Sequence, residues 1–272
     1  MSSKTVSTGS PDVEARLQEA LRELEDHAAK LERSNRDLEQ FAYAASHDLQ
    51  TPLRKVKSFS LLLQKELAPA IAEMDGEQRE RVERYLSFVI EGAERSQQLI
   101  NGLLSFSRIG RRLEQEPISL DACLDAALFI LSEDIEDKGV RIVRSGALPS
   151  ICGDESLITR VFQNLLGNAI KFRHDDRMPC IEVGCDEGPE AFTVFVKDNG
   201  IGIDERHQDR VFVIFQRIGN KKRGTGLGLA LVKKIVESHR GKVWFESTLG
   251  EGSTFKFTVP KGTRCGESVD ES

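Results

Sequence analysis

The apolar positions in the first part of the chain repeat at alternating spacings of four and three residues. This heptad seam predicts a parallel coiled coil over residues 12–40, within one helix of roughly 50 residues and about 75 Å. Asn35 is its polar member, and a buried amide there fixes the register at some cost in stability. The seam consists of Leu17, Leu21, Leu24, Ala28, Leu31, Asn35, Leu38, Ala42 and Ala45, and continues through Leu49, Val56, Phe59 and Leu63.

A second apolar stripe predicts another helix from about Glu77 to Ser107. Pro69 and the Asp75-Gly76 pair mark the loop before it. Two such helices form a hairpin and two hairpins form a four-helix bundle, so residues 41–109 are predicted to be a dimerisation domain. Pro52 removes a backbone donor inside the first helix, which predicts a bend just after His47.

The pattern changes beyond residues 110–117, a charged, turn-prone stretch that we interpret as an interdomain linker. Helices are predicted at 120–131, 155–172 and 227–239, and strands at 140–144, 181–185, 192–197, 242–247 and 254–259. Strands next to strands, mixed with helices, predict an α/β sandwich domain over residues 118–260. The fold class is therefore α+β: a coiled coil and helical hairpin in a dimeric four-helix bundle, then the sandwich. Residues 1–11 and 261–272 are predicted to be disordered.

Composition narrows the function classes. A formal net charge of −6 gives no electrostatic reason to expect nucleic acid or an anionic membrane as a partner. No apolar run approaches the ~20 residues of a membrane span, and residues 1–10 lack the apolar core of a signal peptide. The 5 cysteines have no C-x-x-C spacing, which predicts reduced thiols. We therefore expect a cytoplasmic protein.

One stretch of the first helix carries candidate chemistry. His47 is followed by Asp48 and, one helical turn on, by Thr51. Imidazole attacks phosphorus only when neutral, and with an ordinary pKa near ~6.5 it is mostly neutral at cytoplasmic pH. Asp48 could take the ring proton. A single surface histidine on a helix is more often without a chemical role, so the hypothesis of a phospho-accepting histidine depends on a nucleotide site elsewhere in the chain.

The first signal for such a site is a polar face on the helix at 155–172. Asn164, Asn168 and Lys171 are spaced by four and three, which aligns them along one side, with Phe172 next in sequence. Asn168 can offer an oxygen to Mg²⁺, and Lys171 can neutralise phosphate charge. The alternative is a solvated face opposite the apolar residues of the same helix.

Three further signals follow in order. Asp198, at a strand end, can accept a hydrogen bond from an adenine amino group, and Gly200 and Gly202 let the backbone approach the base. The run from Phe212 to Arg217 contains either core aromatics or a lid hinge. The run Gly224-Thr225-Gly226-Leu227-Gly228-Leu229 opens a helix whose free N–H groups suit phosphate. Between them, residues 221–223 are basic and either contact triphosphate or form a solvated loop.

The motifs and their order resemble the histidine box and the N, first-glycine, F and second-glycine boxes of two-component sensor histidine kinases, whose ATP-binding domain shares the gyrase-type ATPase fold. The resemblance implies that His47 is the acceptor, Asp48 its base and Thr51 the residue that positions water for dephosphorylation of a regulator. It also implies that Asn164 and Asn168 hold Mg²⁺ and Asp198 anchors adenine. The remaining nucleotide contacts that it implies are Lys171, Phe172, Gly200, Gly202, Phe215, Arg217, Gly224, Thr225, Gly226, Leu227, Gly228 and Thr254.

The same resemblance implies a homodimeric enzyme that uses ATP and Mg²⁺, phosphorylates His47 and passes the phosphoryl group to an aspartate on a separate response regulator. We expect the regulator to dock on the helix below His47, at Arg54, Lys57 and Ser60, and input to come from an upstream sensor module or partner. One alternative is a nucleotide-binding dimer that acts mainly as a regulator phosphatase or binding partner. A plain coiled-coil scaffold ranks last because it leaves the nucleotide motifs unexplained.

Overall fold

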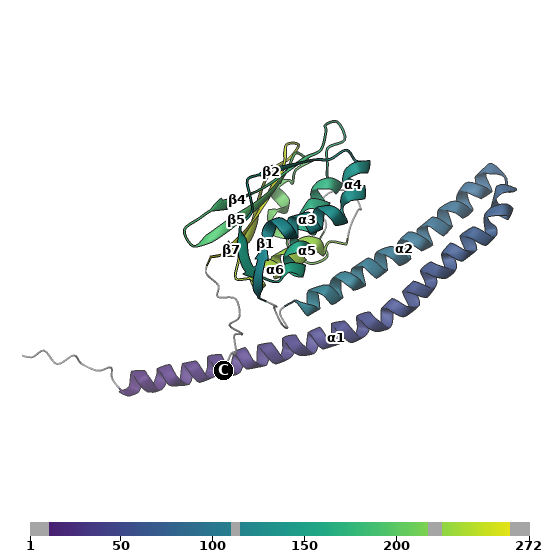
Figure 1. Cartoon of the computed structure of the whole chain (residues 1–272). Coiled ribbons are helices and arrows are strands. Elements are labelled where there is room, and N and C mark those ends of the chain that lie inside the picture. The colour runs from purple at the N-terminus through teal and green to yellow at the C-terminus, as the bar shows by residue number, and fades with distance from the viewer. Residues whose placement is uncertain (1–10, 110–114, 217–224, 262–272) are drawn as a thin grey trace, which may run out of the picture.

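The computed structural model describes residues 11–109, 115–216 and 225–261. A long helical hairpin precedes a compact α/β domain (Figure 1). The first helix, α1, runs over Pro11–Ala72 and continues through Pro52 and Pro69 without interruption. It is longer than predicted, and Pro69 belongs to the helix rather than to the loop. The ends predicted to be disordered were residues 1–11 and 261–272; of these, 1–10 and 262–272 lie outside the described residues, and Pro11 is the first residue of α1.

The second helix, α2, spans Gly76–Arg108 and begins at the cap residue Asp75, whose carboxylate accepts a hydrogen bond from Gln78 N at 2.8 Å. Polar side chains join the two helices of the hairpin. Gln50 Nε2 donates to Asn101 Oδ1 at 2.8 Å, and Lys57 pairs with Glu94 at 2.9 Å. Among its described side chains, Ser60, Ile71 and Ala93 are buried. None of the described helices is long and apolar enough to cross a membrane.

The C-terminal domain contains two sheets. A central sheet has the strand order β2-β4-β5-β7-β6, with β2 parallel to β4 and the other pairs antiparallel. A small sheet pairs β1 with β3. The strands of the whole domain are β1 (Glu116–Ser119), β2 (Arg141–Ser145), β3 (Ser150–Gly153), β4 (Cys180–Glu187), β5 (Ala191–Asp198), β6 (Val243–Thr248) and β7 (Gly252–Pro260). Its helices are α3 (Leu120–Ile130), α4 (Ser132–Asp137), α5 (Glu155–Lys171), the short 3-10 helix η1 (Glu205–Arg210) and α6 (Gly228–Ser238).

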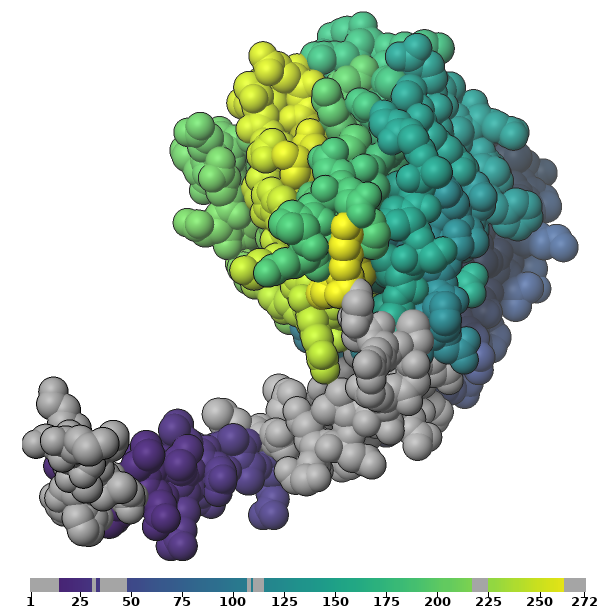
Figure 2. Space-filling model, turned by 60° about the vertical axis from the view of Figure 1, so that its left-hand side comes forward, coloured from purple at the N-terminus to yellow at the C-terminus, as the bar shows by residue number. Residues whose placement is uncertain are grey.

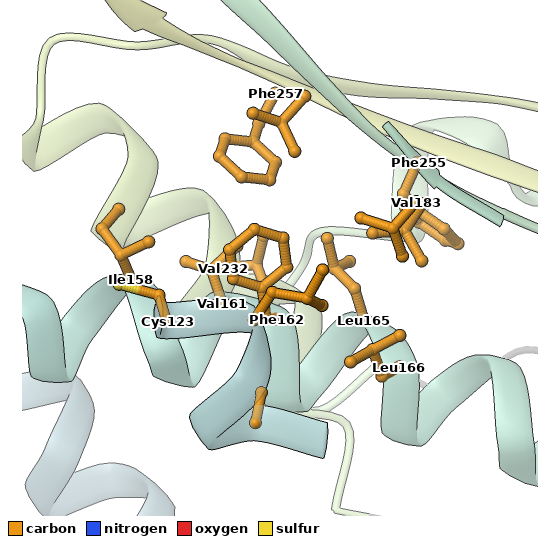
Figure 3. Close-up of a cluster of buried hydrophobic side chains, with 14 of the residues drawn as sticks. Cys123, Ile158, Val161, Phe162, Leu165, Leu166, Val183, Val232, Phe255 and Phe257 are labelled. Atoms are coloured by element: carbon orange, nitrogen blue, oxygen red, sulfur yellow. The ribbon is translucent and has the colours of Figure 1, made fainter. Parts of the chain in front are cut away.

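One helical layer covers one face of the central sheet, as predicted (Figure 1). Figure 3 shows the side chains of α5 pointing toward β7, where Phe162 meets Phe257 edge to face with ring centroids 6.0 Å apart. Both rings are fully buried. Burial of each such side chain is worth about 1.5–3 kcal/mol, so this layer is the main source of the domain's stability.

The structure corrects the predicted boundaries in two places. Glu116 and Pro117, assigned to the linker, are the first residues of β1 and pair with Gly153 and Cys152. Such four-residue strands are too short to show a clear alternation. Lys261, assigned to the disordered tail, pairs with Glu187 and lies 4.8 Å from the centre of the Phe192 ring.

The cysteines also differ from the prediction in part. Cys123, Cys180 and Cys185 are free thiols, whereas Cys152 is disulfide-bonded, so the expectation of reduced thiols is wrong for Cys152. Burial raises the pKa of both Cys123 and Cys185. Neither thiol is therefore activated as a nucleophile.

The end of α2 packs against the C-terminal domain. Arg160 of α5 donates to Ser105 Oγ at 2.8 Å, and the ammonium group of Lys234 on α6 lies 4.4 Å from the centre of the Phe106 ring. Leu227 is buried against Gly102, where an added Cβ would lie 2.5 Å from Leu227 Cδ1. These contacts hold the beginning of α6 beside α2.

Candidate nucleotide-binding site and acceptor histidine

Asp198 is the last residue of β5 and lies partly buried at the end of the sheet. Its Oδ1 accepts hydrogen bonds from Gly200 N at 2.8 Å and from Ser253 N at 3.3 Å. Burial raises the pKa of the carboxyl, and the two N–H donors oppose that rise. In the described part of the chain no hydrogen bond reaches Oδ2, so this oxygen can accept one from a ligand.

The loop after Asp198 is tied down on both sides. Asn199 accepts from Cys180 N at 2.9 Å and donates to Met178 O at 2.9 Å, so its side chain holds the start of β4. Ile201 N donates to Phe172 O at 3.0 Å, which links the loop to the end of α5. The carboxylate is therefore held by a fixed loop.

The two predicted glycines of this loop are required by the protein's own backbone. An added Cβ on Gly200 would lie 2.5 Å from Phe172 O. One on Gly202, whose φ is +68°, would lie 2.0 Å from Thr248 O. A side chain at either position would displace backbone that holds Asp198 in place.

Ser253 lies beside Asp198 and was missed by the sequence analysis, which singled out Thr254. The register pairs Asp198 with Ser253 across β5 and β7. Side chains alternate along a strand, so Ser253 shares the helix-covered face with Phe255 and Phe257, and Thr254 faces the opposite side. The signal that could have found it is this alternation, because the buried phenylalanines of β7 stand at odd numbers.

The predicted polar face of α5 exists and meets the beginning of α6. Asn164 and Asn168 are both half-buried. Asn164 Nδ2 donates to Arg160 O at 2.7 Å, and its Oδ1 lies where an added Cβ on Gly228 would be only 2.7 Å away. Lys171 lies with its ammonium group 4.7 Å from the centre of the Phe172 ring.

Helix α6 begins without a side-chain cap. Its cap residue is Leu227, which makes no capping hydrogen bond through its side chain, so the first-turn N–H groups are available to an anion. Thr225 Oγ1 accepts from Leu227 N at 3.4 Å. Gly226 has a φ of +74°. Gly224 and the predicted basic residues 221–223 lie outside the described ranges.

The two phenylalanines before this segment have different positions. Phe212 packs edge to face on Phe245 with centroids 6.0 Å apart, so it belongs to the core. Phe215 is 54% exposed, and its N–H donates to Gly226 O at 3.0 Å. Its φ of +63° is strained for a residue with a side chain. Arg217 and the rest of the segment 217–224 lie outside the described residues, so the structure does not decide between the two predictions for this run as a whole.

The donor set suits a Mg²⁺ ion that is shared with phosphate. Over the described ranges no group of three or more His, Cys, Asp or Glu side chains could hold a metal ion. Asn168 makes no side-chain hydrogen bond within these ranges, so its amide oxygen is available beside that of Asn164. Mg²⁺ keeps several waters and takes phosphate oxygens, so a few oxygen donors from the protein are sufficient.

The candidate acceptor lies in the middle of α1. His47 belongs to the helix, but its side chain is outside the described set. Asp48 and Thr51 are exposed, and the side chain of Gln50 donates a hydrogen bond to Asn101 of α2. Asn101 precedes Gly102, the residue against which Leu227 packs. The beginning of α6 thus contacts α2 at the level of the helical turn that follows His47.

Two family models match the chain at these two regions. The His kinase A phospho-acceptor domain matches residues 37–112, and the ATPase domain common to histidine kinases, DNA gyrase B and HSP90 matches residues 153–263. The first contains His47 and the hairpin. The second contains Asp198, the polar face of α5 and the beginning of α6.

Curated relatives agree with these domains. Cyanobacterial phytochrome A from Nostoc sp. is 40% identical over 245 residues, which are 89% of this chain and 31% of that protein. The methanogenesis regulatory histidine kinase FilI from Methanothrix harundinacea is 33% identical over 90% of this chain and 27% of its own length. The chain thus spans about three-tenths of the length of these relatives.

Solved structures share the arrangement. Full-length ShkA, crystallised in complex with AMPPNP, matches with a TM-score of 0.62 and 26% identity over 81% of this chain and 45% of its own. The histidine kinase AdeS of Acinetobacter baumannii shares the fold, with a TM-score of 0.53 and 20% identity over 79% of this chain and 97% of its own. From its two domains, their order and these relatives, the chain belongs to the family of two-component sensor histidine kinases.

Proposed function

We propose that the chain is the kinase core of an ATP:protein-histidine phosphotransferase that phosphorylates its own His47. The observation that carries this proposal is the Asp198 carboxylate, which is fixed through Oδ1, leaves Oδ2 to a ligand and lies in the same domain as an uncapped helix N-terminus. A carboxylate acceptor suits the amino group of adenine, and free N–H groups suit phosphate.

Different residues of the domain bind the base, the phosphates and the metal ion. Asp198 anchors the base, the first turn of α6 and Lys171 bind phosphate oxygens, and the amide oxygens of Asn164 and Asn168 hold Mg²⁺ together with the phosphates. The bound ion supplies charge neutralisation on the triphosphate. Phe172 and Phe215 border the base, together with the glycines and Thr225 as backbone contacts. We propose that Ser253 takes the role given to Thr254, because it lies beside Asp198.

The acceptor reacts as a neutral imidazole. A ring nitrogen of His47 attacks the γ-phosphorus in line, so that the new P–N bond forms as the P–O bond to the leaving ADP breaks. Asp48, next in sequence, takes the proton from the other ring nitrogen and keeps the attacking nitrogen unprotonated. Most of the rate enhancement then comes from positioning and charge stabilisation. The use of ATP is also the reason for proposing a cytoplasmic location.

Dimerisation follows from apolar residues that the single chain leaves uncovered. All the described large apolar members of the seam on α1 are exposed, including Leu24 at 65% and Phe59 at 63%. The N-terminal part of α1, purple in Figure 2, extends away from the C-terminal domain. A second copy would cover this face as a coiled coil and a four-helix bundle.

The phosphoryl group would pass to an aspartate of a response regulator. Arg54 is exposed on α1 and suits such docking. The other two residues of the predicted docking surface are less available to a regulator, because Ser60 is buried and Lys57 is paired with Glu94.

We also propose regulator phosphatase activity as the second function, because Thr51 is exposed one turn after His47 and could position a water.

Phosphotransfer to a purified receiver domain separates these two functions. The labelled chain should lose label as the receiver gains it. Asn168→Asp should abolish labelling of the chain while leaving the decay of a phosphorylated receiver unchanged. Thr51→Ala should leave labelling of the chain unchanged and slow the decay of the phosphorylated receiver. A labelled chain that never passes label to any receiver would contradict the transfer step.

A further inference from the structure

Ser247 connects the strands of the nucleotide site to its loop and was not singled out by the sequence. It lies on β6, opposite Ser253 of β7, on the helix-covered face. Its Oγ accepts from Ile203 N at 2.8 Å, donates to Gly252 O at 2.8 Å and lies 3.0 Å from Ser253 Oγ. Three partners thus converge on one hydroxyl group.

The number of protons decides the direction of the contact between the two serines. A hydroxyl has one proton and two lone pairs. Ser247 donates its hydroxyl proton to Gly252 O, and one of its lone pairs accepts the hydrogen bond from Ile203 N–H. The second lone pair can only accept, so the proton in the 3.0 Å contact comes from Ser253. Ser253 is buried, and its Oγ is left with lone pairs alone for any group that approaches from the site.

We infer that Ser247 is a positioning residue for nucleotide specificity, which fixes the Ser253 hydroxyl as an acceptor next to the Asp198 carboxylate. Two neighbouring acceptors suit the 6-amino group of adenine, which has two N–H donors. They repel the 6-oxo group of a hypoxanthine or guanine base, which is itself an acceptor. The inference rests on the proposed function, because it places the base at Asp198.

The same argument predicts what happens when Ser247 loses its hydroxyl. The hydroxyl proton of Ser253 then has no acceptor at position 247, and the hydroxyl group can rotate to point it toward the site. It can be donated to a 6-oxo group, so the preference for adenine should fall. The loop also loses the acceptor of Ile203 N, but that change acts on every nucleotide alike.

The test compares dissociation constants of ATP and inosine triphosphate, whose base has a 6-oxo group and an N1–H donor in place of the 6-amino group and the N1 acceptor of adenine. Titration calorimetry on the full chain with Mg²⁺ would use wild type, Ser247→Ala, Ser247→Thr and Thr248→Ala. In Ser247→Ala the preference for ATP should fall about tenfold, the usual effect of one neutral hydrogen bond. Ser247→Thr keeps the hydroxyl and should restore it. Thr248→Ala removes an exposed hydroxyl from the next residue and should leave the preference unchanged.

An equal weakening of both nucleotides in Ser247→Ala would overturn the inference, because it would give Ser247 a purely structural role in the loop. An unchanged preference at unchanged affinity would overturn it as well. Wild type that binds neither nucleotide would overturn the proposed function itself, and this result is seen before any variant is compared.

Discussion

The hairpin and the C-terminal domain use their aromatic residues in opposite ways. In the domain, Phe162 and Phe257 are fully buried against each other. In the hairpin, Phe59 and Phe88 are 63% and 62% exposed. The domain therefore has a core within one chain, whereas the hairpin leaves many of its described large apolar side chains exposed, which we propose a second copy covers. The proposed acceptor histidine lies in the hairpin, and the proposed nucleotide site lies in the domain.

The largest effect should come from the core of the domain. Phe162→Ala should cost about 3–5 kcal/mol of unfolding free energy, because it leaves a cavity between α5 and β7. Trp244, in β6, is the only tryptophan of the chain, so its fluorescence during urea unfolding follows this domain alone. Phe129 is 82% exposed, and Phe129→Ala should change stability by less than about 0.5 kcal/mol. Equal losses in the two variants would contradict the proposed core.

The next effect should fall on the hairpin alone. Phe59→Asp places a charge in the proposed dimer interface and should weaken dimerisation at least about 30-fold, equivalent to about 2 kcal/mol. Analytical ultracentrifugation over a range of concentrations measures this change. Ser58→Asp adds the same charge at an exposed position outside the seam and should leave the dimer intact. A simultaneous loss in the Trp244 unfolding transition would show that the two regions are not independent.

The nucleotide site should respond without loss of fold. Asp198→Asn removes the charge of the carboxylate that we propose accepts a hydrogen bond from adenine, and it should weaken ATP binding by about 1.5–3 kcal/mol, roughly 10- to 100-fold. Asp186→Asn, an exposed acid on β4, should bind ATP as wild type does. Because the pKa of Asp198 is raised by burial, ATP binding should also weaken as the pH falls through that pKa. Wild-type affinity in Asp198→Asn would remove Asp198 from the site.

The smallest effect concerns His239, which is buried at the end of α6. Its Nε2 accepts from Asp154 N at 3.1 Å, and its Nδ1 donates to Ile235 O at 2.8 Å, so the neutral ring fits both partners. Burial lowers its pKa, and the hydrogen bond to Ile235 O and the carboxylate of Asp154 only partly oppose this. The unfolded chain, with a pKa near ~6.5, then binds the proton more readily.

The stability that the neutral ring of His239 provides is therefore complete above pH ~6.5 and is lost as the pH falls from there through the lowered pKa. Urea unfolding followed by Trp244 between pH 5 and 8 measures the slope, in steps of about half a unit. His239→Gln should flatten the slope in this range. A slope that persists in His239→Gln would assign the dependence to other groups.

The sequence predicted the elements whose pattern is long or fully buried. The heptad seam and the apolar strands 181–185 and 192–197 lie inside the observed α1, β4 and β5, since each repeats one period over several residues. The two strands of the small sheet were missed because four residues carry too little pattern. Pro69 was misread because a proline near the C-terminal end of a helix removes only one hydrogen bond to the preceding turn, and α1 continues to Ala72 despite that loss.

The candidate site was predicted in its residue types but not in its register. Asp198 and Asn164 could be found because their motifs lie on single elements. The alternation along β7 could have placed Ser253 on the buried face, but its position beside Asp198 and Ser247 arises from the pairing of β5, β6 and β7, which no local spacing discloses. Asn199 follows Asp198 in the chain, and only the structure shows that it holds the backbone of residues 178 and 180.

The central claim is that the nucleotide bound by the domain phosphorylates the histidine of the hairpin. The most direct test is incubation with γ-labelled ATP and Mg²⁺, comparing wild type with His47→Gln and Asn168→Asp. We predict label on wild type alone, stable in base and lost in acid, as expected for phosphohistidine. Label that persists in His47→Gln, or its absence from wild type that binds ATP, would contradict the account.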